Sequence, residues 1–283
     1  MIQEFNSMRH QILSYVFRIL VWTMAIVTAS IILFLVGYIL VKGIPNFSAD
    51  LFAWEYTSEN VSLLPAVVNT IFMTFLAIVI AAPIGIFSAI YLTEYARRGN
   101  KIVPVVRLAA ETLAGIPSIV YGLFGMLFFV IALKWGFSLL AGAFTLAVMV
   151  LPVMMRTTEE ALLSVPDTYR EGGFGLGAGH LRTTFSIVLP AAAPGIFAGI
   201  ILSIGRIVGE TAALIFTAGT VAKITSSVFS SARTLSVHMY TLASEGIHID
   251  RAYATAVVLL VLVIIINILS GHVSKKITGE HRG

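Results

Sequence analysis

Cysteine is absent from this chain of 283 residues, and only 11% of its residues are charged. The absence of cysteine excludes disulfide bonds, thiolate metal ligands and a cysteine nucleophile. The low charge, with 58% hydrophobic residues and a mean hydropathy of +0.96, excludes an ordinary water-soluble fold, because soluble domains carry about a quarter charged residues. The sequence therefore predicts an all-α integral membrane protein.

Long apolar runs are what the sequence does contain. About 20 mostly apolar residues cross the hydrocarbon core of a bilayer as a helix, which satisfies every backbone polar group within its own segment. Residues 1–18 precede the first such run, and residues 275–283 follow the last. The region 19–274 is therefore predicted to be one transmembrane domain of six helices, at 19–41, 60–93, 112–133, 135–155, 183–222 and 252–274.

The positions of Lys and Arg predict how these helices are oriented, because short cytoplasmic loops carry an excess of both residues. If the N-terminus is cytoplasmic, twelve of the 18 basic residues fall in cytoplasmic segments, five fall in outer segments, and Arg206 lies inside the fifth span. Both termini are therefore expected in the cytoplasm. The formal net charge of +4 reflects this bias and gives no indication of a nucleic-acid partner.

Few polar side chains outside the spans suggest chemistry. His238 and His248 lack the spacing of metal ligands, and we expect both to be exposed to solvent or to contact a docking protein. Glu159 and Glu160 follow the fourth span and are expected to face water. No His-Glu-x-x-His sequence is present, so the sequence predicts no metal, no cofactor and no catalytic residue, and an intramembrane enzyme is rejected.

The cytoplasmic segment 164–190 has stronger local signals than a simple connection needs. Ser164 is followed three residues later by Asp167, which is typical of the start of a helix. Glycines at alternate positions across 175–179 are expected to end this helix, and 180–189 can form a second one. The sequence therefore predicts helix, turn and helix rather than a bare linker.

The spacing of residues in this segment resembles the coupling loop of ABC importer permeases. In that family the loop fits a cleft on a cytoplasmic ATP-binding subunit, and the resemblance implies the same contact here. An amphipathic connector on the membrane surface is the alternative, but it would not explain the spacing. The residues assigned to this coupling loop are Arg170, Glu171, Gly177, Ile187, Leu189 and Pro190.

Gly172 and Gly173 depart from the family pattern, in which alanines are usual at these positions. Because glycine costs a helix about 0.8 to 1.0 kcal/mol relative to alanine, the first helix of the loop is expected to be marginal without its ATPase. The nearby GLGAGH stretch could be mistaken for a dinucleotide-binding turn. That motif requires a preceding strand and a βαβ unit, which this sequence does not provide.

Two further stretches narrow the resemblance. YLTEYA at 91–96 and LAGIPSIVYGLFG at 113–125 resemble the permease subunits of phosphate-specific ABC importers, most closely the PstA type, and the match extends from about residue 69 to the last span. The resemblance implies the type I ABC importer permease fold and inorganic phosphate as cargo. It also implies two ATP-binding subunits, a second permease of the PstC type, an extracytoplasmic phosphate-binding protein, and a bacterial or archaeal plasma membrane.

Arg206 and Glu210 are four residues apart within the fifth span. With a helix that starts near Pro194, Arg206 is expected near the middle of the membrane, where a charge costs about 2.5 to 3.5 kcal/mol and must face protein or water. One interpretation is an intrahelical salt bridge, although Arg before Glu is the less favourable order. The other places both residues on the substrate pathway, with Arg206 holding phosphate and Glu210 competing for its guanidinium as the anion leaves.

Small residues in the same span predict a close contact with another helix. Gly195 and Gly199 are four residues apart, and so are Gly205 and Gly209. Such repeats let helix backbones approach each other closely in a membrane. The fifth span is therefore expected to lie near the centre of the bundle.

The source of energy and the cargo are separate questions. No G-x4-G-K-[ST] sequence occurs, so the chain cannot bind ATP through a P-loop and is expected to depend on a partner ATPase. The coupling loop does not identify the cargo, so a permease for another oxyanion or small solute is one alternative. A proton- or sodium-coupled carrier, with Arg206 and Glu210 as the ion-linked site, is another, but it leaves the coupling loop unexplained.

Overall fold

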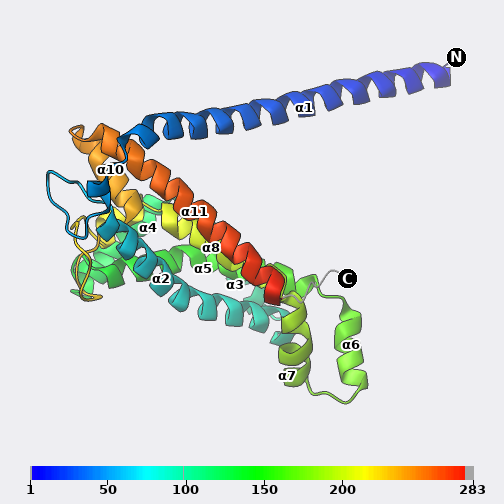
Figure 1. The fold of residues 1–283 in the computed structure, drawn as a ribbon. Helices are drawn as coiled ribbons and strands as arrows, with labels where there is room; N and C mark the ends of the chain where they lie inside the picture. The colour runs from blue at the N-terminus through cyan, green and yellow to red at the C-terminus, as the bar shows by residue number, and fades with distance from the viewer. Residues whose placement is uncertain (1, 98, 278–283) are drawn as a thin grey trace.

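The computed structural model of the chain describes residues 2–97 and 99–277, and every regular element in these residues is helical (Figure 1). Short 3₁₀ turns occur at Ile44–Asn46 and Ala49–Phe52, and π-helical turns at Tyr91–Tyr95, Met126–Ala132 and Thr184–Val188. The α-helices are α1 (Ile2–Gly43), α2 (Leu64–Ile90), α3 (Ile102–Ala114), α4 (Ser118–Gly125), α5 (Leu139–Leu163), α6 (Asp167–Gly175), α7 (His180–Thr183), α8 (Leu189–Gly209), α9 (Ala212–Thr217), α10 (Leu235–Glu245) and α11 (Ile249–Ile277).

Five stretches of helix are long and apolar enough to cross a membrane, and a bent pair of helices can make a sixth crossing. The pair consists of α3 and Ser118–Ala132, which meet at an angle of 101°. The predicted number of spans is therefore reached only when this pair counts as one. The five continuous spans are Leu13–Asn46, Leu64–Tyr95, Leu139–Leu163, His180–Gly209 and Ile249–Leu269.

The prediction of a continuous third helix over 112–133 is wrong. Pro117 is extended, with φ −60° and ψ 142°, and a proline disfavours the α conformation in the residue before it, which is Ile116. α3 therefore ends at Ala114, and α4 begins at Ser118 in a new direction. This break brings the two halves of the span against different parts of the bundle.

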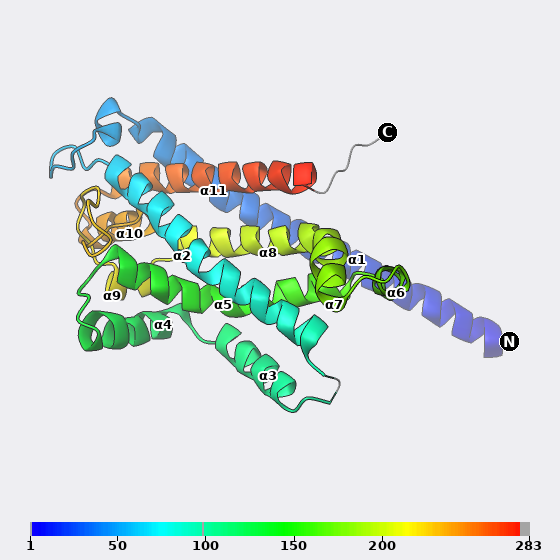
Figure 2. The same cartoon turned by 90° about the horizontal axis from the view of Figure 1, so that it is seen from below.

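α5 lies at the centre of the bundle and packs against α2 on one side and α8 on the other (Figure 2). Small residues of α2, among them Ala77 and Gly85, permit this contact, and a Cβ added at Gly85 would lie 3.1 Å from Cβ of Met154. At the start of α5, the Ser138 hydroxyl accepts a hydrogen bond from the Ala141 amide (3.2 Å) and caps the helix. α5 is thus the central helix against which α2 and α8 pack.

The predicted close approach along α8 occurs over its first half. A Cβ added at Gly195 would overlap Cβ of Ala161, and one added at Gly199 would overlap the hydroxyl of Thr157. The two later glycines of the repeat have no described atom within 4 Å of such a Cβ. α8 therefore packs tightly on α5 near its N-terminal end and less closely towards Arg206.

At the end of the molecule opposite α6, the loop 218–234 is fastened to α2 by the buried side chain of Asn69. Its Nδ2 donates hydrogen bonds to the carbonyls of Lys223 (2.8 Å) and Arg233 (3.2 Å), and its Oδ1 accepts one from the Thr225 amide (3.1 Å). Three backbone groups of this irregular segment thereby obtain hydrogen-bond partners.

His238 is buried at the same end of the molecule, and the expectation that it is exposed is wrong. Its ring lies edge-on to that of Tyr56 with centroids 6.0 Å apart, and its side chain is fully buried. Burial, followed by the positive charge of Arg233, lowers the pKa of His238 to about 4. The ring is therefore neutral at physiological pH. His248 is half-buried.

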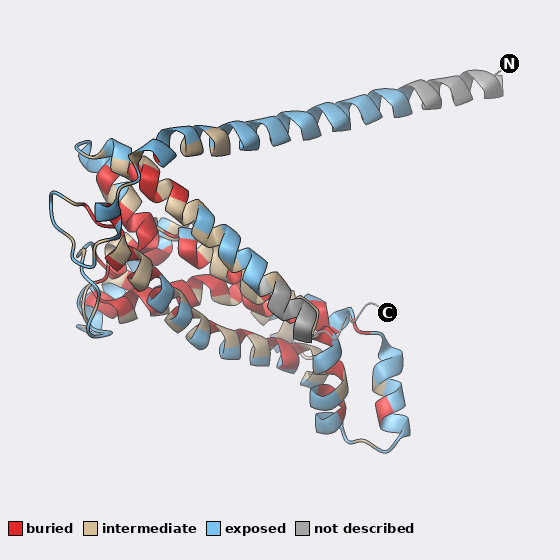
Figure 3. Ribbon diagram, in the orientation of Figure 1, coloured by how far each residue is buried: buried red, intermediate tan, exposed pale blue. Residues whose placement is uncertain are grey.

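α1 leaves the bundle and contacts it mainly through α11 (Figure 3). Every side chain in the range 13–35 is exposed, although the segment is almost entirely apolar, whereas the backbone at Gly43 packs closely on Tyr253. α1 therefore offers a long apolar surface to lipid or to another protein. The beginning of α1, the end of α11 and α6 all lie towards one end of the molecule, as a cytoplasmic location of all three requires (Figure 1).

Candidate functional site

The segment predicted as a coupling loop extends from the bundle as α6 and α7 (Figure 1). α6 ends at Gly175, the chain turns through Gly177 with φ +79°, and α7 begins at His180, so the predicted helix, turn and helix are present. The predicted side-chain cap of α6 by Ser164 is absent. The Ser164 hydroxyl donates to the carbonyl of Ala161 (2.7 Å) at the end of α5, and no side chain caps α6.

The second half of this segment does not end at Pro190. α7, a π-helical turn and α8 continue one another, so that a single helical stretch extends from His180 to Gly209. Pro190 lies in the first turn of α8, where the missing amide proton has little cost. The α6–α7 segment is therefore directly continuous with the helix that carries Arg206.

Exposed side chains cover the end of the α6–α7 segment. Leu176 is 90% exposed, Leu181 and Phe174 are also exposed, and Glu171 faces outward beside them. Gly172 has open space around it, whereas a Cβ at Gly173 would lie 2.9 Å from Cδ1 of Ile187 and 3.0 Å from Cγ2 of Thr183. Gly173 is therefore the point where α6 packs against the following helix.

Arg170 points inward rather than towards a partner. Its guanidinium donates to Glu94 (2.7 Å) and Asp167 (3.2 Å) and to the carbonyls of Val165 (2.8 Å) and Leu162 (3.0 Å). The hydrogen bond to Glu94 raises the pKa of Arg170 above its ordinary value. Arg170 therefore holds α6 against the ends of α2 and α5, and sequence reasoning did not identify Glu94 as its partner.

The helix that carries Arg206 ends before Glu210, so the two residues do not share a helical face. α8 begins at Leu189 rather than near Pro194 and ends at Gly209, and Glu210 is extended with φ −73° and ψ 128°. No ion pair between Arg206 and Glu210 occurs in the described part of the chain. The interpretation of an intrahelical salt bridge is therefore wrong.

Glu210 is held at this break by its own hydrogen bonds. Its carboxylate accepts from the amide of Ala213 (3.1 Å) at the start of α9, and its carbonyl accepts from the hydroxyl of Ser236 (2.6 Å). The side chain is buried. Arg206, in the last turn of α8, is half-buried. The break thus places a cation without a carboxylate partner among the described residues of the bundle.

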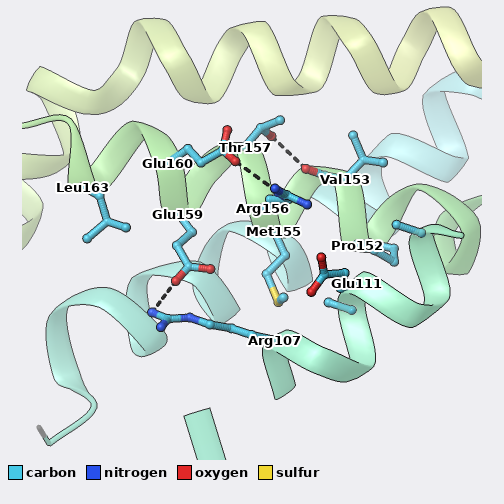
Figure 4. Close-up of a pocket in the computed structure, with 12 residues that line it drawn as sticks. Arg107, Glu111, Pro152, Val153, Met155, Arg156, Thr157, Glu159, Glu160 and Leu163 are labelled. Atoms are coloured by element: carbon cyan, nitrogen blue, oxygen red, sulfur yellow. Dashed lines mark hydrogen bonds and ion pairs between the residues drawn. The ribbon is translucent and has the colours of Figure 1, made fainter. Parts of the chain in front are cut away.

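A second group of charges lines a cavity of about 570 Å³ between α3 and α5 (Figure 4). Arg107 of α3 forms an ion pair with Glu159 of α5, and Arg156 pairs with Glu160 at 3.1 Å. Glu160 is exposed as expected, but Glu159 is only 8% exposed, so the expectation that it faces water is wrong. The positions of Arg156, Glu159 and Glu160 at the end of an apolar run were the available signal.

These groups can bind an anion. Guanidinium groups such as those of Arg206, Arg107 and Arg156 match the oxygens of an oxyanion. Within residues 2–97 and 99–277, no cluster of three or more His, Asp or Glu side chains could hold a metal ion. The arrangement therefore suits passage of a solute.

Comparisons with known proteins identify the family. A family model described as the inner membrane component of binding-protein-dependent transport systems matches residues 81–279. The chain is 32% identical to the probable ABC transporter permease protein YqgI of Bacillus subtilis, over 90% of this chain and 94% of that protein. It is 40% identical to the phosphate transport system permease protein PstA of Pasteurella multocida, over 64% of each chain.

The fold is shared with a solved transporter. A bacterial ABC transporter involved in the import of the acidic polysaccharide alginate matches with a TM-score of 0.61 and 18% identity, over 92% of this chain and 96% of that one. The predicted fold of a type I ABC importer permease is thereby confirmed. The chain belongs to the inner membrane components of binding-protein-dependent transport systems, as a permease subunit of an ABC importer whose ATP is hydrolysed by separate subunits.

Proposed function

We propose that this permease subunit carries inorganic phosphate across the membrane and that Arg206 contacts the anion. The observation that carries the proposal is the half-buried guanidinium of Arg206, which has no carboxylate partner in the described residues. A buried cation is costly unless something neutralises it, and a passing oxyanion would do so. The similarity to a phosphate transport permease supports phosphate as that oxyanion.

Phosphate suits this position for chemical reasons. It carries between one and two negative charges near neutral pH, and the planar guanidinium can donate to two of its oxygens at once. Glu210 lies four residues further on, where its carboxylate holds the start of α9 and its negative charge limits how tightly an anion binds. We therefore assign Arg206 to anion contact and Glu210 to positioning of the break.

The α6–α7 segment, within 164–190, is proposed to contact the ATP-binding subunits. Its exposed apolar side chains, Phe174, Leu176 and Leu181, lie beside Glu171 at the end of the molecule proposed to be cytoplasmic. The segments 1–18 and 275–283 are proposed to be cytoplasmic as well. Exposed apolar residues gathered at one tip suit a protein contact. Gly177, Ile187, Leu189 and Pro190 form the turn and the helical connection to Arg206.

The complete importer is proposed to contain further subunits. The exposed apolar surface of α1 requires lipid or a second permease, for which a PstC-type heterodimer partner is proposed. Two ATP-binding subunits would then face the two coupling loops. The outer loops held by Asn69 are proposed to receive an extracytoplasmic phosphate-binding protein, in a bacterial or archaeal plasma membrane.

Uptake of labelled phosphate tests this function. In cells that lack their own permease subunit, Arg206→Gln is expected to reduce uptake at least tenfold, while the ATPase still co-purifies with the complex. Arg97→Gln, which removes an exposed arginine, is the matched control and should leave uptake unchanged. Wild-type uptake in Arg206→Gln would contradict the role of Arg206, and inhibition by sulfate or molybdate as strong as that by unlabelled phosphate would contradict the cargo.

A further inference from the structure

The cavity between α3 and α5 contains a second arginine whose hydrogen-bonding capacity is mostly unused (Figure 4). Arg107 donates through Nη2 to Glu159, and its guanidinium has no other polar partner among the described residues. Its side chain is 48% exposed and lines the cavity, whereas that of Glu159 is 11% exposed. An arginine has five N–H donors, so most of those on Arg107 can still bind another group.

Arg170 shows what a structural arginine in this chain looks like. Its donors are satisfied by two carboxylates and two backbone carbonyls, and its side chain is 18% exposed. Arg107 shares only the single carboxylate contact. The difference indicates that Glu159 positions the guanidinium of Arg107 but leaves most of its N–H donors without a partner among the described residues.

α3 places Arg107 where the proposed anion route can reach it. None of the thirteen residues of α3 is fully buried, and half-buried Val103, Val106 and Ala110 pack it against the bundle. At the break after α3, the Tyr121 hydroxyl donates to the carbonyl of Leu113 (2.7 Å). A Cβ added at the neighbouring Gly122 would overlap the backbone of Ala213, which follows the break at the end of the helix that carries Arg206. The break therefore connects the surroundings of Arg206 to the helix that carries Arg107.

We propose that Arg107 is a second anion-contacting residue, on the cytoplasmic side of Arg206, and that Glu159 positions it. The inference rests on the proposed function, since it deepens the route of the same oxyanion. Phosphate leaving Arg206 binds the free donors of Arg107. The carboxylates of Glu111, Glu159 and Glu160 line the same cavity and repel the anion, so that binding there is weak and release to the cytoplasm follows.

Phosphate uptake by the assembled complex tests the inference. Arg107→Gln is expected to reduce the maximal rate at least tenfold, and Arg107→Lys to retain part of it because the charge persists. Arg97→Gln is again the control with an unchanged rate. Uptake by Arg107→Gln at the wild-type rate would overturn the inference.

A double variant distinguishes contact of Arg107 with the anion from a role of Arg107 that only attaches α3 to α5. Arg107→Met combined with Glu159→Leu replaces the ion pair by an apolar contact, which is often neutral for stability. Loss of uptake in this variant, with the ATPase still co-purifying, is the expected result. Normal uptake in the double variant while Arg206→Gln is inactive would overturn only the role of Arg107. Normal uptake in Arg206→Gln would overturn the proposed function, and this inference with it.

Discussion

The arginines of this protein differ in role because they differ in how many partners surround them. Arg170 donates to two carboxylates and two carbonyls, Arg107 to one carboxylate, and Arg206 to no acidic group in the described residues. The sequence distinguished Arg206 by its position within a span, but it named the actual partner of none of the three. Their partners come from other helices, so the number of contacts, and with it the proposed role, is decided by packing.

Burial of His238 makes stability dependent on pH. The pKa of a histidine in an unfolded chain is about 6.5, and that of His238 is lowered to about 4, so the unfolded state binds more protons between these values. The contribution of the neutral His238 ring to the free energy of unfolding is therefore complete above about pH 6.5 and is lost as the pH falls towards 4. It amounts to at most about 3 kcal/mol.

Thermal unfolding of the detergent-solubilised protein measures this effect. The melting temperature of the wild type is expected to fall between pH 6.5 and 4.5, and that of His238→Gln to fall less steeply over the same range. His248→Gln, at a half-buried position of the same end of the molecule, should retain the wild-type slope. Equal slopes for wild type and His238→Gln would contradict the buried neutral ring.

At the scale of elements, two neighbouring glycines in α6 are predicted to respond differently to alanine. Gly172→Ala has open space and should stabilise α6 by about 1 kcal/mol, because alanine is the better helix former. Gly173→Ala would push Cβ towards Ile187 and Thr183, so α6 has to move away from the following helix. We expect slower amide hydrogen exchange in α6 for the first variant and weaker ATPase co-purification for the second.

The pair of glycine variants contains its own control, because both add the same methyl group to the same helix. Equal effects of the two substitutions on hydrogen exchange and on ATPase co-purification would show that the packing of Gly173 on the following helix is unimportant. A stronger loss at Gly172 than at Gly173 would contradict the placement of α6.

The helices themselves were largely predictable from the sequence, and the exceptions have physical reasons. Five of the six predicted spans contain a continuous helix long enough to cross the membrane, because apolar length alone sets a membrane crossing. The third span fails at Pro117, and the fifth ends at Gly209, where apolar content gives no warning. Hydropathy measures burial in lipid and is insensitive to a local change of backbone direction.

At the scale of the whole molecule, one exposed residue at the end of the α6–α7 segment is predicted to be needed for contact with the ATPase. Leu176 is 90% exposed, so Leu176→Asp should not affect the fold but should remove apolar contact with the ATPase. We expect at least a tenfold loss of ATPase co-purification. Ile247→Asp, at a residue 76% exposed between α10 and α11, is the control at the other end of the molecule.

The two aspartate variants also test the orientation of the protein. Loss of the ATPase in Leu176→Asp alone supports a cytoplasmic α6–α7 segment. Loss in Ile247→Asp alone would place α10 on the cytoplasmic side and would reverse the predicted topology.

The resemblance of its motifs identified the permease family, and the sequence by itself determined that this protein is all-α and membrane-spanning, where its five continuous spans lie, and that the segment 164–190 forms helix, turn and helix. These features depend on apolar length, charge in short loops and local helix signals, all of which are properties of neighbouring residues. Only the tertiary structure decided the partners of the charges: Glu94 for Arg170, Arg107 for Glu159, and none among the described residues for Arg206. Those partners are brought together by helices distant in the chain, so no local pattern could specify them.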